Sequence, residues 1–127
     1  MPKRGNKEFL LDIIEAIKKI ELYTKELGYQ DFLQKMETQD AVVRNFEIIG
    51  EAVKNISKTL KEKYKDIQWK EIAGMRDKVI HFYFGVNWDI VWRAAKDSLP
   101  PFKEKIERIV KVIEESKNEE SKNKSGY

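Results

Sequence analysis

Apolar side chains recur every three or four positions along most of this 127-residue chain. An α-helix turns once in about 3.6 residues, so this spacing places them on one face of a helix. The first stripe begins near Asn6, which can cap a helix, and ends near Gly28, which can stop one. Because each apolar face needs a neighbour to cover it, the pattern predicts helices packed on helices. The stripe comprises Phe9, Leu10, Ile13, Ile14, Ile17 and Ile20.

Similar stripes and stop signals predict the remaining helices. Thr38 should open a long helix, and Asn87 should cap a later one. Trp88 and Trp92 stand one turn apart, a spacing more typical of a core than of a ligand cage. The elements expected after Gly28 are a turn or two at 31–36, a long helix at 38–64, a helix at 69–84, one at 88–98, and a last helix from 102 that Pro100 and Pro101 separate from it.

The composition favours the same architecture. Hydrophobic residues make up 41% of the chain and charged residues 37%, with only six glycines and three prolines, which is typical of helical bundles. A chain of this length can form one compact core but not two ordinary domains. We therefore predict an all-α fold, a single-domain antiparallel bundle of about five helices in residues 1–115. Residues 116–127 lack apolar side chains until Tyr127 and are predicted to be a disordered charged tail.

Charge and residue usage limit the kinds of site that one chain can build. The formal net charge of +3 favours a polyanionic partner only weakly. Without cysteine the chain forms no disulfide and no thiolate metal site, and a single histidine excludes a histidine-rich zinc site within one chain. We therefore expect neither metal nor cofactor. No apolar run approaches the roughly 20 residues of a membrane-spanning helix, so we expect a cytoplasmic protein without membrane contact.

The segment GMRDKVIHFYFGV, residues 74–86, contains the only histidine, His81. On an ideal helix with Arg76 at zero, Tyr83 lies at about 340°, Asp77 at about 100° and His81 at about 140°. Arg76 and Tyr83 thus share one line of the helix. His81 lies nearly opposite the apolar stripe of this helix, which consists of Ile72, Met75, Val79 and Phe82. Asp77 precedes His81 by one turn, so its carboxylate can hold the imidazole by a hydrogen bond, as suits an acid–base catalyst. The plainer interpretation is an exposed pair of little consequence.

The angle between Arg76 and His81 raises the question of how both could contact one phosphate. At about 140° apart they do not share a helix face. A symmetric dimer with this helix at its interface would relieve the problem, because each cleft could then be lined by residues of both subunits. We therefore expect a homodimer.

The long helix carries further candidate residues. Arg44, Glu47 and Glu51 share a face at three-and-four spacing, which ordinarily makes a solvated ladder of ion pairs. Asn45 sits beside the apolar stripe, and Gly50 in the helix interior suggests the close approach of another backbone. We retain Arg44, Asn45 and Glu51 as candidate cleft or dimer contacts.

The segment with Arg76 and His81 resembles the R-x4-H-x-Y signature of the HEPN-domain toxins, in particular the HepT subgroup paired with a minimal nucleotidyltransferase antitoxin. The stretches AVVRNFEIIGEAVKNIS, IQWKEIAGMR and VWRAAKDSLPPFKEKI resemble the surroundings of this signature in the family, so the resemblance covers about residues 8–114. It implies a small helical homodimer with Arg76 and His81 in a cleft at the interface, acting as a metal-independent endoribonuclease. The toxin role and the antitoxin partner are likewise implied by the resemblance.

The implied chemistry is consistent with one histidine per chain. When the RNA 2′-hydroxyl attacks the phosphorus, a base must take its proton, an acid must protonate the leaving 5′-oxygen, and a cation must stabilise the phosphate. His81 would be the acid or base, Arg76 the cation and Asp77 a support. In the HepT subgroup, the tyrosine that matches Tyr83 is the residue that the transferase modifies with AMP, so Tyr83 is a candidate AMPylation site and supporting residue.

Two other functions remain open at this point. The same arginine and histidine could hold a nucleotide in a non-catalytic partner of the nucleotidyltransferase, or they could merely pair across the interface of a structural helical dimer. A catalytic protein should arrest growth when expressed alone, whereas the other two should not. The most informative single observation would be whether the neighbouring reading frame encodes a small nucleotidyltransferase.

Overall fold

The structure, a computed structural model, describes residues 4–81 and 87–125, apart from the side chains of residues 76, 78–81 and 119–125. The described residues form helices and no strand, so the predicted all-α class is confirmed. Four elements are long, and the others are short helices or a π-helical segment. The elements are α1 (Asn6–Thr24), α2 (Tyr29–Gln34), α3 (Met36–Asn55), α4 (Lys58–Lys63), α5 (Trp69–His81), α6 (Trp88–Arg93), η1 (Ala94–Ser98) and α7 (Leu99–Ser125).

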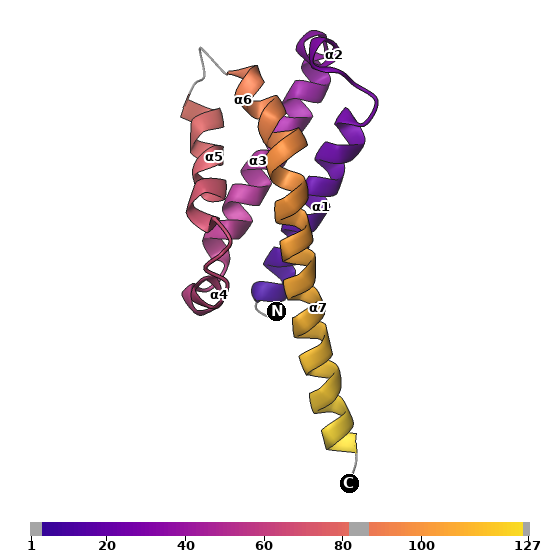
Figure 1. Cartoon of the computed structure of the whole chain (residues 1–127), viewed down its shortest axis with the longest axis vertical. Helices are drawn as coiled ribbons and strands as arrows, with labels where there is room; N and C mark the ends of the chain where they lie inside the picture. The colour runs from indigo at the N-terminus through magenta and orange to yellow at the C-terminus, as the bar shows by residue number, and fades with distance from the viewer. Residues whose placement is uncertain (1–3, 82–86, 126–127) are drawn as a thin grey trace.

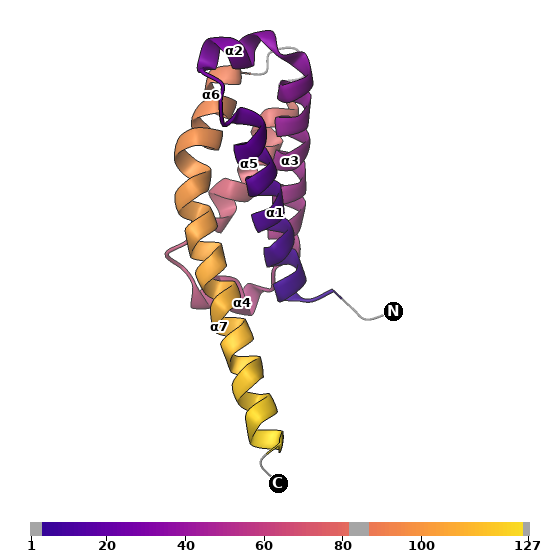
Figure 2. The same cartoon turned by 90° about the vertical axis from the view of Figure 1, so that its right-hand side faces the viewer.

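The long helices form the predicted antiparallel bundle. In Figure 1, α1 and α5 run in one direction, while α3 and the column of α6 and α7 run in the other. Helix α3 packs against both α1 and α5, and α7 packs against α1. The quarter-turn view in Figure 2 shows α2 closing one end of the bundle and α4 the other.

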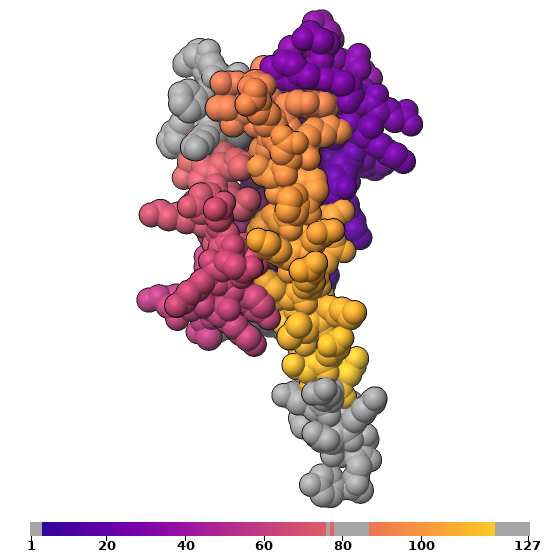
Figure 3. Space-filling view, viewed as in Figure 1, coloured from indigo at the N-terminus to yellow at the C-terminus, as the bar shows by residue number. Residues whose placement is uncertain are grey.

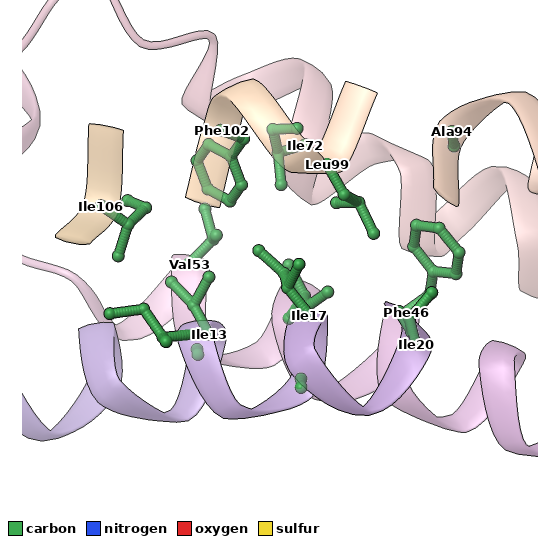
Figure 4. Packing of buried hydrophobic residues seen from close by; sticks show 14 of the residues in the cluster. Ile13, Ile17, Ile20, Phe46, Val53, Ile72, Ala94, Leu99, Phe102 and Ile106 are labelled. Atoms are coloured by element: carbon green, nitrogen blue, oxygen red, sulfur yellow. The ribbon is translucent and has the colours of Figure 1, made fainter. Parts of the chain in front are cut away.

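Apolar side chains from all the long helices fill the core. The predicted α1 stripe is confirmed, since Leu10, Ile13, Ile17 and Ile20 are fully buried. In Figure 4 the side chains of α1 point toward those of the other helices. The buried residues that the figure labels are Ile13, Ile17, Ile20, Phe46, Val53, Ile72, Ala94, Leu99, Phe102 and Ile106.

The tryptophans of α6 join this core, as predicted. The ring of Phe32 in α2 lies with its centroid 5.8 Å from that of Trp88 and 5.1 Å from that of Trp92. The predicted cap is confirmed as well, because Asn87 Oδ1 accepts hydrogen bonds from the N–H groups of Asp89 and Ile90. Helix α6 is therefore fixed at its start and along its inner face.

The chain does not form one helix from Thr38 to Tyr64, as the sequence predicted. Helix α3 already begins at Met36 and ends at Asn55, and α4 follows as a separate helix. Ile56 leaves the helical conformation with a ψ of 137°, and the Ser57 hydroxyl then accepts a hydrogen bond from the N–H of Leu60 at 3.2 Å. A serine cap of this kind starts a new helix.

A contact with the start of α1 explains why the break falls at this point. The Asn6 side chain donates to Ser57 Oγ at 2.9 Å, and its Oδ1 accepts from the Ser57 N–H at 2.9 Å. The prediction that Asn6 caps α1 is thus wrong. The cap is Gly5, whose N–H donates to the Glu8 carboxylate at 2.9 Å. Hydrogen bonds from the backbone N–H groups of Glu8 and Gly5 lower the pKa of the Glu8 carboxyl.

The two prolines do not separate the last helix from α6, as predicted. The helical backbone passes through the π-helical segment η1 directly into α7. Pro100 and Pro101 are the second and third residues of α7 and follow η1 without a break, so they donate no backbone hydrogen bonds to the carbonyls one turn earlier. The N–H of Leu99 donates to the carbonyl of Ala94, the longer-range bond that a π-helix makes.

Helix α7 also continues beyond the predicted boundary at residue 115. Its backbone stays helical to Ser125, and Figure 1 shows this part projecting past the end of the bundle. The residues from Glu114 to Asn118 are exposed, so the extension receives little support from the core. The segment contains no glycine before Gly126 and is rich in Lys and Glu, which favour helix. The predicted disorder of residues 116–127 stays a prediction.

We predict that Ser57→Ala lowers the free energy of unfolding by about 1 kcal/mol, the usual cost of a lost helix cap. The alanine removes the acceptor for the Leu60 N–H and the acceptor for the Asn6 side chain. Urea unfolding of the two proteins measures the difference. Thr59→Ala is the matched control, since Thr59 is exposed in the same short helix; an equal loss in both variants would contradict the assigned cap.

Candidate active site

Helix α5 carries Arg76 and His81 on one continuous backbone from Trp69 to His81. The side chains of both residues, and all of Tyr83, lie outside the described residues. The first turns of α5 are firmly anchored. Trp69 is buried, its Nε1 donates to the carbonyl of Tyr64 at 3.1 Å, and its ring meets Phe102 of α7 edge-on, with centroids 6.1 Å apart.

The register of α5 relates the two motif positions to the core. Trp69 and Ile72, which are buried, define the line of the helix that faces the core. Arg76 follows Trp69 by seven residues and therefore occupies nearly the same line of the backbone. His81 follows Gly74 by seven residues, on the opposite side, and Asp77 near that side is exposed. This register matches the angles on which the dimer prediction depends.

Gly74 interrupts the exposed side of α5 without a packing reason. In the described part of the chain, no atom lies within 4 Å of the position that a Cβ would take, and no described glycine has a positive φ. Glycine in a helix interior costs about 1 kcal/mol relative to alanine. The fold of the described single chain thus does not require glycine at this position.

The structure distinguishes between the three candidate contacts on α3. Arg44 is 70% exposed and its Nη1 lies 3.3 Å from Glu47 Oε2, which is the ion-pair ladder that the spacing predicted. Arg44, Glu47 and Glu51 line a groove of about 400 Å³ between α1 and α3, opposite Arg4 and Asp12. The groove belongs to the face shared by α1 and α3, and α5 adds no residue to its described lining.

Asn45 belongs to the interior instead. It is only 5% exposed, and its Nδ2 donates to the Ala41 carbonyl at 2.8 Å. Its Oδ1 is buried and has no hydrogen-bond partner among the described residues. Asn45 thus belongs to the bundle interior of the described chain, and its role as a cleft or dimer contact stays a prediction.

A second groove, which the sequence did not predict, runs beside α5, the helix that carries Arg76 and His81. It lies between the start of α5 and the start of α7, where Lys105 approaches Asp66 at 3.9 Å. Met75, the residue before Arg76, is part of its lining. Residues about 30 positions apart form this groove, so no local pattern in the sequence could have indicated it. The groove is lined by Asp66, Ile67, Gln68, Glu71, Ile72, Met75, Ser98, Pro101, Phe102 and Lys105.

The described residues contain neither a cluster of metal-ligand side chains nor a membrane-spanning helix. Nowhere in ranges 4–81 and 87–125, as far as described, do three or more His, Asp or Glu side chains gather as metal ligands would. None of the described helices is long and apolar enough to cross a membrane.

Comparison with known proteins decides the family. The sequence profile of the family described as "Ribonuclease HepT-like" matches residues 13–109, which include both Arg76 and His81. The chain belongs to the HepT-like ribonuclease family. The resemblance seen in the motif and its surroundings is thereby confirmed, together with the enzyme class.

Relatives of this HepT-like ribonuclease share nearly its whole length. It is 50% identical over 114 residues to "Putative RNase MJ1216" of Methanocaldococcus jannaschii, covering 90% of this chain and 94% of that protein. It is 48% identical over 109 residues to "Probable ribonuclease HepT" of Thermococcus cleftensis, covering 86% of this chain and 99% of that protein. No solved structure matches the chain significantly.

Proposed function

We propose that this HepT-like ribonuclease is the toxin of a toxin–antitoxin pair and cuts RNA internally without a metal ion. The observation that carries the proposal is the family match, which spans the only histidine of the chain and the arginine one and a half turns before it on α5. His81 acts as acid or base, Arg76 stabilises the phosphate, and Asp77 orients the imidazole. The partner is a minimal nucleotidyltransferase antitoxin.

The reaction needs two proton transfers and one lasting positive charge. A base removes the proton of the 2′-hydroxyl, the 2′-oxygen bonds to phosphorus, and the 5′-oxygen leaves with a proton from an acid. The products are a 2′,3′-cyclic phosphate and a free 5′-hydroxyl. Imidazole suits both transfers near neutral pH, and the planar guanidinium of arginine suits the phosphate oxygens.

A homodimer supplies the second imidazole that one chain lacks. Gly74 supports this part of the proposal, because it lies on the same line of α5 as His81 and nothing in the described chain requires a glycine there. Glycine allows another backbone to approach closely. The second backbone is the α5 of a partner subunit, so that the two motif helices face each other.

We predict that the purified protein is a dimer at micromolar concentration and that Gly74→Leu shifts it toward the monomer. A leucine side chain would hold the two helices apart at the line that contains His81. Light scattering measures the mass, and circular dichroism checks that the helices persist. Lys19→Leu, at an exposed position of α1, is the control for added apolar surface. A monomeric wild-type protein would contradict the composite site.

The activity itself is tested with RNA and DNA of the same sequence in the presence of EDTA. The proposed route requires a 2′-hydroxyl, so the RNA should be cut and the DNA left intact. Expression alone should arrest growth, and co-expression of the proposed transferase partner should restore growth. Tight nucleotide binding without RNA cleavage would instead indicate a non-catalytic partner of the transferase.

A further inference from the structure

The positive charge of the chain is concentrated around α4. Residues 54–65 contain five lysines and one glutamate, a net charge of +4, whereas the whole chain carries +3. The remaining 115 residues therefore sum to −1. We name this group the α4 lysine cluster. It consists of Lys54, Lys58, Lys61, Lys63 and Lys65.

Most of this charge is available to a partner. Every member of the cluster is exposed except Lys61, which is half-buried. Lys58 Nζ lies 3.9 Å from Glu62 Oε1, but the Lys58 side chain is 91% exposed. An ion pair this exposed contributes little to stability in water. Lys63 lies 5.8 Å from the ring centroid of Tyr64. Among the described residues, Lys54, Lys61 and Lys65 have no ion-pair partner.

The segment that carries the cluster is held rigidly. Ser57 caps α4 and is bonded twice to Asn6, which lies 51 residues earlier in the chain. Leu60 and Tyr64 pack against the core, and the Tyr64 carbonyl accepts the Trp69 indole N–H. The break in the long helix at Ile56 therefore produces a fixed end of the bundle that presents lysines to solvent.

The cluster lies on the same side of the molecule as the motif helix. Figure 3 shows α4 and the start of α5 side by side along one edge. His81 lies twelve residues after Trp69, a rise of about 18 Å along α5. In a strand stacked as in a duplex, with one phosphate per roughly 3.4 Å of rise, about five nucleotides span that distance.

We propose that the α4 lysine cluster binds phosphates of the RNA substrate at a distance from the cleavage site. This inference rests on the proposed function, since it takes RNA to be the substrate. Lysine contributes a point charge and no planar recognition, so the cluster holds the backbone of any sequence. Longer RNAs are therefore bound more tightly than short ones, and binding weakens with salt.

The test compares two triple variants of equal charge change, each in a His81→Ala background so that RNA stays intact. One is Lys58→Gln, Lys63→Gln, Lys65→Gln in the cluster. The other is Lys18→Gln, Lys19→Gln, Lys25→Gln, at two exposed positions on α1 and at the exposed residue that directly follows it. For a labelled single-stranded RNA of about 20 nucleotides at about 0.1 M salt, the cluster variant should bind about tenfold more weakly. The α1 variant should lose less than about twofold.

The dependence of RNA affinity on salt concentration and on RNA length provides two further readouts. The negative slope of log K against log salt should become shallower by about 2 in the cluster variant. The reason is that three phosphate contacts are lost and each single-strand contact contributes about 0.7. The loss of affinity should shrink as the RNA is shortened to about four nucleotides. A third variant with arginine at the same three positions should bind like the parent, which shows that charge is what is lost.

Equal weakening in both glutamine variants would overturn the inference, because it would reflect net charge alone. No weakening in the cluster variant, or no RNA binding by the parent, would also overturn it. The proposed function fails separately, if the protein with His81 intact does not cut RNA. A cluster-dependent affinity without cleavage would support the α4 surface and contradict the ribonuclease mechanism.

Discussion

Replacing His81 or Arg76 with alanine should lower RNA cleavage by about 100-fold to 10,000-fold, the usual cost of removing an essential acid–base group or phosphate-stabilising group. His81→Ala removes the only imidazole of each chain, and Arg76→Ala removes the charge that offsets the phosphate. Both variants should also lose the ability to arrest growth. The measurement is the rate of cleavage of a labelled single-stranded RNA by purified protein in EDTA.

The controls for this prediction must separate lost chemistry from lost structure. Arg108→Ala removes an exposed arginine on α7 and should cut RNA at the wild-type rate. Circular dichroism and light scattering should show that each alanine variant keeps its helices and its dimer. Undiminished cleavage by the double variant, or cleavage that depends on an added divalent metal, would rule out the proposed roles.

If the proposed partner is correct, co-expression with a cognate minimal nucleotidyltransferase should add one or more AMP units to Tyr83 and abolish cleavage. The tyrosine is predicted to share a helix line with Arg76, so an AMP ester there would place a phosphate against the guanidinium and an adenosine where the RNA binds. The toxin would then be silenced without unfolding. Intact-protein mass spectrometry measures the addition, and the RNA assay measures the silencing.

Two tyrosine variants locate the modification. Tyr83→Phe should show no mass increase and should remain toxic in the presence of the transferase. Tyr23→Phe, at a tyrosine that is 38% exposed on α1, should be modified like the wild type. The AMP switch at Tyr83 is excluded if the mass increase persists in Tyr83→Phe or is never seen. A persistent mass increase would place the modification at another residue, whereas no increase at all would indicate that the antitoxin acts by occupying the site.

The helices could be predicted from sequence because their information is local. The stripe from Leu10 to Ile20 is buried as its spacing indicated, and Asn87 caps α6 as its chemistry indicated. The break at Ile56 could not be predicted in this way. It depends on Asn6, whose partner Ser57 becomes its neighbour only in the folded bundle. Residue type alone suggested a cap at Asn6, but its side chain serves another helix.

The features of the candidate site likewise differ in whether local sequence encodes them. The spacing of Arg76 and His81 fixes their register on α5, so the motif was visible in the sequence. Asn45, by contrast, was chosen for its place beside a stripe and proved to be buried. The groove between α5 and α7 depends on how two distant segments pack, as does the exposure of the α4 lysines. Such features follow from tertiary structure and leave no periodic signal.

The most direct test of the central claim is the chemistry of the cut ends. The protein should be incubated in EDTA with an RNA that it cuts, and with the same RNA carrying one 2′-deoxynucleotide on the 5′ side of the scissile bond. We predict a 2′,3′-cyclic phosphate and a 5′-hydroxyl by mass spectrometry, no cut at the deoxy position, and no products from His81→Ala. Products with a 5′-phosphate, or cleavage at the deoxy position, would contradict that claim.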